Sequence, residues 1–225
     1  MVIVVGTGKL ARELLRALPS ASSTKVIAWA NAAKTLTEGS SVVVHAGSGR
    51  ELEDVITYCQ ETESTLVELA TGSEIENREV NFPVVVCPNT NILMLKFLAM
   101  LAESGHHFKN YTVRVIESHQ AEKSSVPGTA VKLAQSLGLQ SEKIRSIRDP
   151  REQRETLQIP PEYLSRHAYH RVEIEDQVGS IVLETRVFGP APYAEGLAQI
   201  ISALRSNKLE NRRYSIMEFI ENGWV

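Results

Sequence analysis

Two basic side chains, His119 and Lys123, lie four residues apart in the segment ESHQAEKSSVPGTA, which has no apolar period. The preceding residues alternate as in a half-buried strand and a helix is predicted over PGTAVKLAQSLG, so both side chains must lie on the connecting loop. An imidazole and an ammonium group can each transfer a proton. Gly128 and Thr129 follow at the helix start, where unpaired N–H groups and the positive dipole end favour a carboxylate.

This loop also has an interpretation without catalysis. His119 would then be a hydrogen-bonded residue at the end of a strand, and Lys123 would be a solvated surface charge. The sequence of the loop alone does not exclude that alternative.

A second candidate site lies near the N-terminus, where the turn Gly6-Thr7-Gly8 follows the apolar run VIVV and precedes a helical pattern. Glycines here let the backbone approach a pyrophosphate, whose charge the free N–H groups of a helix start can accept. Ala11 takes the third position of the G-x-G-x-x-G pattern, which needs only a small side chain. The alternative is a tight turn in an α/β domain that binds nothing. We expect a dinucleotide to contact Gly6, Thr7, Gly8, Lys9 and Leu10.

The end of the second predicted strand offers Asn31 and then Lys34, where NAD-specific sites usually carry an acidic residue. Without a carboxylate to repel it, a 2′-phosphate fits here with Lys34 as its counter-charge. These residues favour NADPH, with NADH tolerated. The alternative is that Lys34 is an ordinary solvated lysine that binds no phosphate.

The elements that position the glycine turn alternate along the first half of the chain. Pro19 is expected to end the first helix. Strands alternating with helices predict a parallel sheet with right-handed crossovers, as in Rossmann-like domains of the α/β class. Short β-branched runs predict strands at 2–5, 25–30, 41–47, 65–72 and 83–89, and apolar residues at helical spacing predict helices at 9–18 and 50–62.

From Asn89 the pattern changes to an α+β domain with a mostly antiparallel sheet. A long apolar helix (91–105) precedes the strand 111–119, and two alternating runs predict antiparallel strands at 167–176 and 179–189. Residues 141–160 are charged and weakly patterned, so we interpret them as a variable excursion. We therefore assign residues 1–88 with 192–225 to a dinucleotide-binding domain, and residues 89–191 to a substrate-binding and oligomerisation domain.

The composition limits the classes of partner. A formal net charge of −3 over 225 residues gives no electrostatic case for nucleic acid or an anionic membrane. No apolar run is long enough to span a bilayer. The two cysteines, Cys59 and Cys87, show no metal-ligand spacing, which suits a reducing cytoplasm. Exposed edges of an antiparallel sheet need pairing, so a homo-oligomer is expected.

Taken together, the motifs resemble the dihydrodipicolinate reductase family over nearly the whole chain. The family signature is E-x-H-H-x-x-K followed by P-S-G-T-A, and the corresponding residues are Glu117, His119, Lys123, Gly128, Thr129 and Ala130. CPNTNILMLKFL resembles the strand, loop and helix that join the two family domains. ELATG resembles the G-T-T cofactor loop, and PYAEGL resembles the F-A-N-G-A helix start.

The resemblance implies hydride transfer from NADPH or NADH to a small cyclic imine dicarboxylate of lysine and diaminopimelate biosynthesis, by a tetramer assembled through the antiparallel sheet. It implies that His119 and Lys123 lie beside the substrate, with Lys123 as the proton donor. Gly128 and Thr129 would hold a substrate carboxylate. Residues expected near the nicotinamide are Ala70, Thr71, Gly72, Asn89 and Thr90.

Three departures from the family pattern bear on the substrate. Gln120 replaces the second histidine of the family pair, Pro127 replaces a serine, and Pro190 falls where the family has a carboxylate-binding arginine. Loss of such partners weakens binding of a buried carboxylate. Two alternatives therefore stay open: the same fold reducing a different small imine or acid, and a non-catalytic nucleotide-binding regulatory protein.

Overall fold

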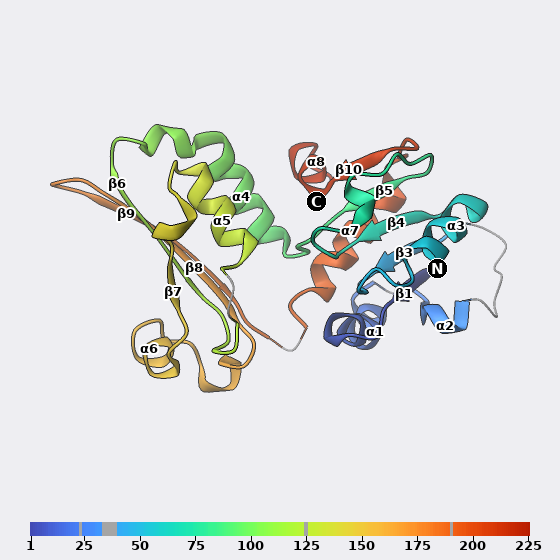
Figure 1. The fold of residues 1–225 in the computed structure, drawn as a ribbon, viewed down its shortest axis with the longest axis horizontal. Helices are drawn as coiled ribbons and strands as arrows, with labels where there is room; N and C mark the ends of the chain where they lie inside the picture. The colour runs from blue at the N-terminus through green and yellow to red at the C-terminus, as the bar shows by residue number, and fades with distance from the viewer. Residues whose placement is uncertain (23, 33–39, 124–125, 190) are drawn as a thin grey trace. The chain divides into compact units, whose positions relative to one another are not determined.

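The computed structural model describes the chain except residues 23, 33–39, 124–125 and 190. The chain forms two compact units, Met1–Leu95 with Tyr193–Val225, and Lys96–Pro192. Each unit has a sheet of its own (Figure 1). The expected combination of a Rossmann-like parallel sheet with a mostly antiparallel second sheet is confirmed.

The first unit is built on six parallel strands in the order β10-β5-β4-β3-β1-β2. Buried β-branched side chains fill the central strands, since a parallel sheet with helices on it is covered from both sides. The strands are β1 (Val2–Val5), β2 (Val26–Ala28), β3 (Val42–His45), β4 (Thr65–Glu68), β5 (Val84–Val86) and β10 (Arg213–Ser215).

Helices cover this sheet as the apolar spacing predicts. The buried side of α3 consists of Leu52, Val55, Ile56 and Cys59, which pack with strand residues in one core cluster. Helices α1 and α7 pack against each other. The helical segments are α1 (Lys9–Ser22), α2 (Trp29–Ala32), α3 (Leu52–Thr62), α7 (Ala194–Ser206) and α8 (Ile216–Glu221), with a short 3₁₀ turn at Glu74–Glu76.

Two local predictions in this unit are wrong, and one strand is missing from the prediction. Helix α1 does not end before Pro19 but continues to Ser22, because proline near a helix end costs one hydrogen bond without forbidding the helical φ. The second strand ends at Ala28, and Trp29 already belongs to α2. Strand β10 was not predicted, because its three residues carry no alternating apolar pattern.

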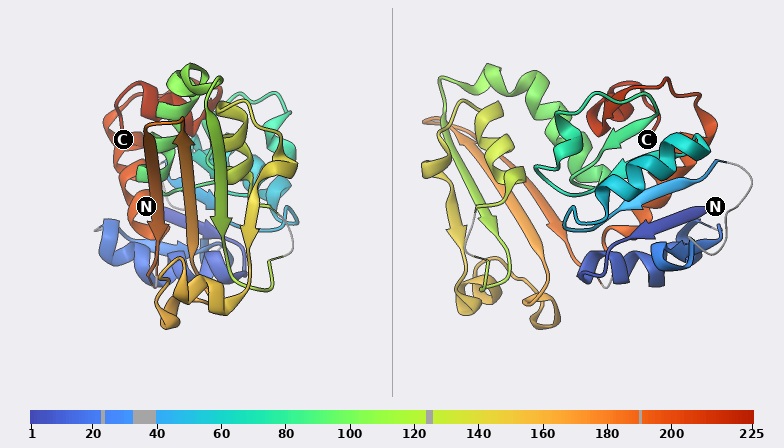
Figure 2. Two further views of the ribbon diagram at one scale, coloured as in Figure 1. Left: turned by 90° about the vertical axis from the view of Figure 1, so that its left-hand side faces the viewer. Right: turned by 45° about the vertical axis from the view of Figure 1, so that its right-hand side comes forward.

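The second unit has a four-stranded sheet in the order β7-β6-β8-β9. The β6–β8 and β8–β9 pairs are antiparallel, whereas β7 runs parallel to β6. Helices α4 and α5 lie on one face of this sheet, behind the strands in the left view of Figure 2. The strands are β6 (Thr112–Ser118), β7 (Arg145–Ile147), β8 (Ala168–Glu175) and β9 (Ser180–Val187). The helices are α5 (Gly128–Ser136), α6 (Pro150–Glu155) and α4 (Ile92–Ser104), whose first residues up to Leu95 still belong to the first unit.

Residues 141–160, interpreted from the sequence as a variable excursion with a weak pattern, contain regular structure. They form a 3₁₀ turn (Ser141–Lys143), the edge strand β7 and the short helix α6, which Asp149 caps by accepting a hydrogen bond from the Glu152 amide. A further 3₁₀ turn, Pro161–Tyr163, leads to β8. In the described part of the chain, no helix combines the length and apolar character that a bilayer crossing demands.

Candidate active site

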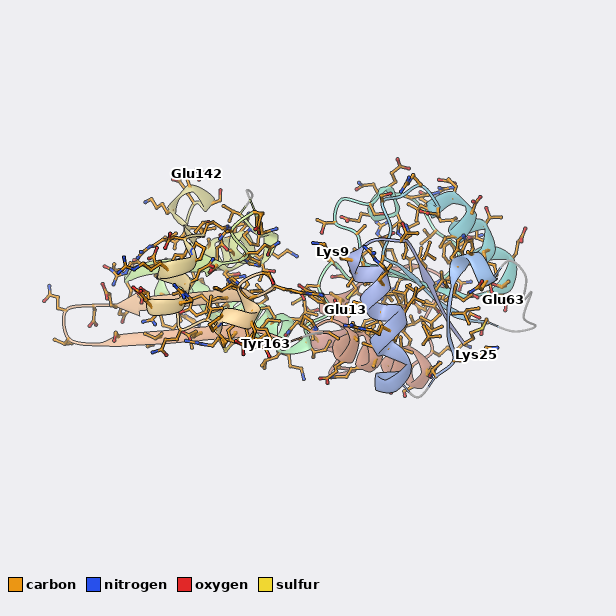
Figure 3. All side chains as sticks on the ribbon, turned by 90° about the horizontal axis from the view of Figure 1, so that it is seen from below. Lys9, Glu13, Lys25, Glu63, Glu142 and Tyr163 are labelled. Atoms are coloured by element: carbon orange, nitrogen blue, oxygen red, sulfur yellow. The ribbon has the colours of Figure 1, made fainter. Side chains whose placement is uncertain are left out.

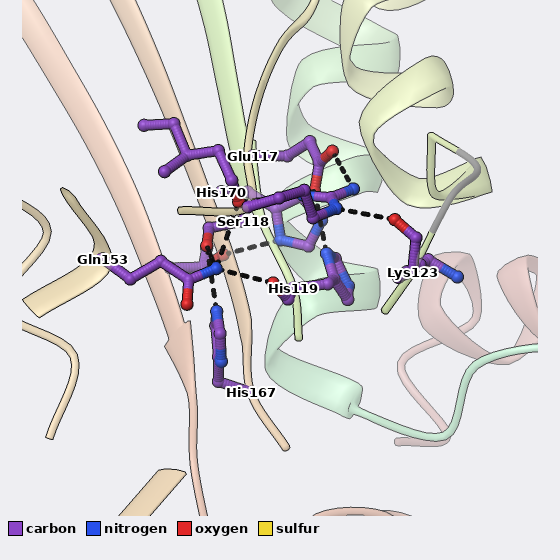
Figure 4. Close-up of polar contacts among 10 residues, drawn as sticks. Glu117, Ser118, His119, Lys123, Gln153, His167 and His170 are labelled. Carbon is purple, nitrogen blue, oxygen red and sulfur yellow. Dashed lines mark hydrogen bonds and ion pairs between the residues drawn. The ribbon is translucent and has the colours of Figure 1, made fainter. Parts of the chain in front are cut away.

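The predicted loop begins with a carboxylate–imidazole pair at the end of β6. Side chains two residues apart on a strand share a face, which brings Glu117 and His119 together. The Nδ1 of His119 lies 2.8 Å from Oε2 of Glu117 (Figure 4). The Glu117 carboxylate is fully buried, whereas the His119 side chain keeps 14% of its surface exposed. Glu117 thus orients an imidazole that solvent can still reach.

Arg148, from the segment between β7 and α6, binds the other side of the same carboxylate. Its Nη2 donates to Oε1 of Glu117 at 2.6 Å, and its Nη1 donates to Oε2 at 3.1 Å. Burial alone would raise the pKa of Glu117, but hydrogen bonds from His119, Arg148 and Ser146 lower it to about 2. Glu117 is therefore ionised at neutral pH and can only accept hydrogen bonds.

Lys123 lies in the turn that follows. Its backbone N–H donates to the Gln120 carbonyl at 3.0 Å, and its carbonyl accepts from Nε of Arg148 at 2.9 Å. The side chain is half-buried, and in Figure 4 its nitrogen points away from Glu117. Within the part of the chain that the structure describes, the Lys123 ammonium group has no ion pair with an acidic residue. It is thus available to a ligand.

Two further histidines surround the end of β6, beginning with His167. His167 Nδ1 lies 3.1 Å from the Tyr163 carbonyl and must donate to it, so Nε2 accepts the hydrogen bond from the Ser118 hydroxyl at 2.9 Å. The amide nitrogen of Gln153 donates to the Ser118 hydroxyl at 3.1 Å and to the His119 carbonyl at 2.8 Å. These bonds fix the backbone at the point where the strand becomes the loop.

His170 is buried beside His119, with ring centroids 5.6 Å apart in an edge-to-face arrangement. Burial first, and the nearby His119 second, lower the pKa of His170 to about 3. Its Nε2 has no hydrogen-bond partner among the described residues. None of the described His, Cys, Asp and Glu side chains form a metal-binding group of three or more. His170 is therefore a buried, neutral imidazole beside His119.

Helix α5 begins directly after the loop. Pro127 is the N-cap residue with an extended backbone, and it provides no side-chain hydrogen bond. The first turn holds no acidic side chain, so the N–H groups at Gly128 and Thr129 are not matched by a carboxylate of the helix itself. This helix start suits an anionic ligand, as the sequence predicts.

In the first unit, the glycine turn has the geometry that a pyrophosphate requires. Gly6 has φ +115°, and a Cβ at this position would lie 2.7 Å from the Ala46 carbonyl oxygen. A Cβ on Gly8 would meet no atom within 4 Å. Lys9 stands at the N-terminal end of α1 (Figure 3), and the first turn of this helix has no acidic residue. The open space at Gly8 and the free N–H groups fit a phosphate.

Ala70, Thr71 and Gly72 follow the carboxyl end of β4, and Asn89 and Thr90 follow β5. Because the strands are parallel, these loops lie at the same sheet edge as the glycine turn. Thr90 is buried and its hydroxyl donates to the Tyr193 carbonyl at 2.9 Å, so its side chain holds the fold of this unit together.

A buried pair that was not predicted supports the loop after β4. Nδ1 of His45 lies 2.8 Å from Oε2 of Glu68, and both side chains are fully buried. The same carboxylate accepts from the Ala70 amide at 2.8 Å and from the Ser73 hydroxyl at 3.0 Å. A Cβ on Gly47 would lie 2.8 Å from Nε2 of His45, so the imidazole packs directly under the loop after β3.

The remaining predicted positions are less defined. Asn31 lies in α2 with an exposed side chain. Lys34 and Pro190 lie outside the described residues. Gln120 lies next to His119 in the turn and is half-buried.

Residues 91–220, more than half of the chain, match the family model described as dihydrodipicolinate reductase, C-terminus. The chain belongs to the dihydrodipicolinate reductase family. The matched region contains the whole loop from Glu117 to Thr129 and the segment that carries Arg148.

Named relatives agree with the family. The chain is 31% identical over 153 residues to 4-hydroxy-tetrahydrodipicolinate reductase 2, chloroplastic, of Arabidopsis thaliana. This alignment covers 62% of this chain and 44% of that protein. It is 23% identical over 244 residues to 4-hydroxy-tetrahydrodipicolinate reductase of Rickettsia bellii, and this alignment covers 99% of this chain and 96% of that protein. The aligned part spans less than half the length of the four plant relatives.

Solved structures show the same fold. Dipicolinate-bound dihydrodipicolinate reductase from Paenisporosarcina sp. TG-14 matches with a TM-score of 0.63 at 14% identity, covering 96% of this chain and 97% of that one. The diaminopimelate (DAP) dehydrogenase of C. glutamicum in complex with DAP gives a TM-score of 0.51 at 7% identity, covering 96% and 92%. At these identities the likeness concerns the fold alone.

Sequence reasoning missed several side chains of this family member's candidate site. Glu117 was recognised as part of the motif, and its spacing from His119 was a usable signal for a shared strand face. Arg148 and Gln153 gave no local signal, because their partners lie about thirty residues away in the sequence. His167 and His170 carry no ligand spacing and join the site only when β8 pairs with β6.

Proposed function

We propose that the chain is an NAD(P)H-dependent reductase that acts on 4-hydroxy-tetrahydrodipicolinate, or the cyclic imine derived from it, in lysine and diaminopimelate biosynthesis. The observation that carries the proposal is the Lys123 ammonium group, which forms no ion pair with an acidic residue in the described part of the chain. It lies four residues after a partly exposed imidazole that Glu117 orients. The family membership and the names of the relatives support the choice of substrate.

The substrate half of the reaction uses the loop and the start of α5. Gly128 and Thr129 present N–H groups and a hydroxyl to a substrate carboxylate. His119 faces the ring through its exposed edge. A nicotinamide cofactor supplies a hydride, and the electron pair that arrives in the conjugated imine must then take up a proton. Lys123 donates that proton and is recharged from solvent, so the conjugated imine gains one hydride and one proton. Where the 4-hydroxy compound is the substrate, its hydroxyl group first leaves as water to give that imine.

The cofactor half of the reaction uses the turn Gly6-Thr7-Gly8 with Lys9 and Leu10 for the pyrophosphate, and the loops at 70–72 and 89–90 for the nicotinamide. Residues 1–88 with 192–225 would form this dinucleotide-binding domain. Asn31 and Lys34 offer no carboxylate to a 2′-phosphate, which favours NADPH over NADH. Calorimetric titration with both nucleotides tests this, and tighter NADH binding would contradict it.

Residues 89–191 would hold the substrate and form the oligomer, for which we propose a tetramer assembled through the face of the second sheet opposite α4 and α5. The proposed location is the cytoplasm. Both cysteine thiols are buried, and burial raises the pKa of Cys59 and Cys87 to about 12, as suits thiols without redox chemistry.

The decisive test is a steady-state assay of NADPH oxidation with the product of dihydrodipicolinate synthase. Lys123→Ala should lower kcat by roughly 10²- to 10⁴-fold, the usual contribution of a positioned general acid. Lys132→Ala is the matched control, since Lys132 is an exposed lysine of the neighbouring helix α5. Absence of turnover by the wild-type protein, or equal losses in both variants, would refute the proposal.

A second candidate keeps the hydride chemistry and changes the substrate to a different small imine or acid. Two positions favour it: Gln120 cannot become cationic, and Pro127 offers no side-chain donor at the start of α5. This alternative predicts that pyridine-2,6-dicarboxylate inhibits poorly while activity still depends on Lys123. Tight competitive inhibition by that compound would exclude it.

A further inference from the structure

Arg148 contacts both halves of the catalytic loop at once. Its two Nη atoms bind the Glu117 carboxylate, and its Nε donates to the Lys123 carbonyl at 2.9 Å (Figure 4). A fourth hydrogen bond, from Nη1 to the carbonyl of Ile147 at 3.0 Å, ties the guanidinium to its own backbone. The side chain keeps 21% of its surface exposed, so it is held mainly by these bonds.

The planar guanidinium group suits this position for a geometric reason. It carries five N–H donors in a fixed fork, so one side can bind a carboxylate with two bonds while Nε serves a third acceptor. A lysine has the same charge but no such fork. The Glu117 carboxylate is fully buried and would lack a charged partner without Arg148, since its other charged contact is the titratable His119.

Glu117 transmits this restraint to His119. Because the ionised carboxylate only accepts, the proton of a neutral His119 must lie on Nδ1, and Nε2 is left as the atom that faces a ligand. The hydrogen bond from Arg148 Nε to the Lys123 carbonyl acts on the other side of the loop. It fixes the backbone of Lys123 at the end of the turn that Gln120 begins.

We propose that Arg148 is the positioning residue that sets the tautomer of His119 and the backbone of Lys123 together. It touches neither substrate nor cofactor and acts through Glu117 and the loop backbone. Its kinetic consequence rests on the proposed reductase function, whereas its effect on the histidine does not. Gln153 has a different role, since it bonds Ser118 and the His119 carbonyl and not Glu117 or Lys123.

The test compares Arg148→Met and Arg148→Lys with Arg145→Met in the full chain. Arg145 is the matched control, because it lies on the same segment and its side chain pairs at the surface with Glu152 and, among the described residues, with no group of the loop. Long-range ¹H–¹⁵N correlation spectra report the His119 tautomer, assigned through its loss in His119→Gln. We expect the Nδ1–H form in the wild type and in Arg145→Met. In Arg148→Met we expect a mixture of tautomers, because the guanidinium group no longer keeps Glu117 ionised and fixed beside His119.

Steady-state kinetics provide the second readout. Arg148→Met should lower kcat roughly 100-fold, the scale of an ångström-sized misplacement, with the KM for NADPH unchanged. Arg148→Lys should recover part of kcat, because it keeps the charge beside Glu117 without the fork. Should Arg148→Met fail to fold, the double variant Glu117→Gln/Arg148→Met removes the unpaired buried charge and should fold, yet keep the low kcat.

An unchanged His119 tautomer with wild-type kcat in Arg148→Met would overturn the proposal, as would an equal loss in Arg145→Met. If the wild-type protein turns over no substrate, the reductase proposal fails by itself. The tautomer measurement then still decides whether Arg148 positions His119.

Discussion

Single ionisable groups determine how the candidate site responds to pH. Glu117 stays ionised because three side chains donate to it, and its pKa of about 2 lies below the ordinary value of 4.5. His170 stays neutral because it is buried next to another imidazole, and its pKa of about 3 lies below the ordinary value of 6.5. The lowered pKa of Glu117 favours the folded state above pH 4.5, and this advantage is lost in acid. The lowered pKa of His170 has no effect at neutral pH and disfavours the folded state below pH 6.5.

At the residue scale, we predict that His170 causes stability to fall between pH 7 and pH 5. Below pH 6.5 the unfolded chain protonates this imidazole, whereas the folded chain does not until about pH 3. By linkage the loss is about 2 kcal/mol at pH 5. His167, whose pKa burial also lowers, adds a loss of the same sign.

Urea unfolding of the wild type and His170→Gln at pH 7 and pH 5 measures this effect. The variant should be less stable at pH 7 but should lose less stability on acidification. His106→Gln is the control, because His106 is exposed. Equal pH dependence of wild type and His170→Gln would show that the buried imidazole is not responsible.

At the scale of the element, the β1–α1 turn separates the demands of folding from those of binding. Gly6 must be glycine because its φ is +115° and a Cβ would collide with the Ala46 carbonyl. Gly8 has ordinary φ and free space on its Cβ side, so the fold itself does not require glycine there. Only a ligand that approaches the backbone closely would require it.

Two alanine variants exploit this difference. Gly6→Ala should destabilise the protein by about 1–3 kcal/mol through backbone strain and collision. Gly8→Ala should leave the melting temperature unchanged but weaken NADPH binding, because its methyl group fills the space of a phosphate. Thermal melts and calorimetric titration measure both. Wild-type NADPH affinity in Gly8→Ala would argue against a pyrophosphate at this turn.

The elements that sequence reasoning located are those whose pattern is local. The period of Leu52, Val55, Ile56 and Cys59 predicted the buried side of α3, because a helix presents every third or fourth residue to one face. Strand β10 and the hydrogen bonds from Arg148 to Glu117 and Lys123 were not predictable in this way. The strand depends on pairing with β5, and the bond to Glu117 joins residues 31 apart, so neither leaves a pattern in its own segment.

At the scale of the whole molecule, the face of the second sheet opposite α4 and α5 carries a ladder of charged side chains. Arg114 binds Glu173 at 3.0 Å and Glu175 at 2.7 Å, and Arg171 binds Glu173 at 2.7 Å. Exposed pairs of this kind add little to the stability of a single chain. Val182, directly opposite Glu173 in the register, is 46% exposed.

We predict that light scattering after size-exclusion chromatography gives four times the mass of the chain. Val182→Asp should lower that mass, because it places a charge in the middle of the proposed interface, where association would remove it from water. Val178→Asp should not, since Val178 is 95% exposed at the tip of the hairpin. A monomer in the wild type, or an identical response to both substitutions, would rule out assembly through this face.

The buried pair of His45 and Glu68 connects the ends of β3 and β4, so substitutions at the two positions should depend on each other. Replacing Glu68 alone would remove the hydrogen-bond acceptor of the Ala70 amide and the Ser73 hydroxyl. Replacing His45 alone would leave the buried carboxylate without its imidazole partner. In related sequences, His45 and Glu68 should therefore be replaced together and not singly. Gly47, pressed against the imidazole, should gain a side chain only in lineages that have already lost the histidine.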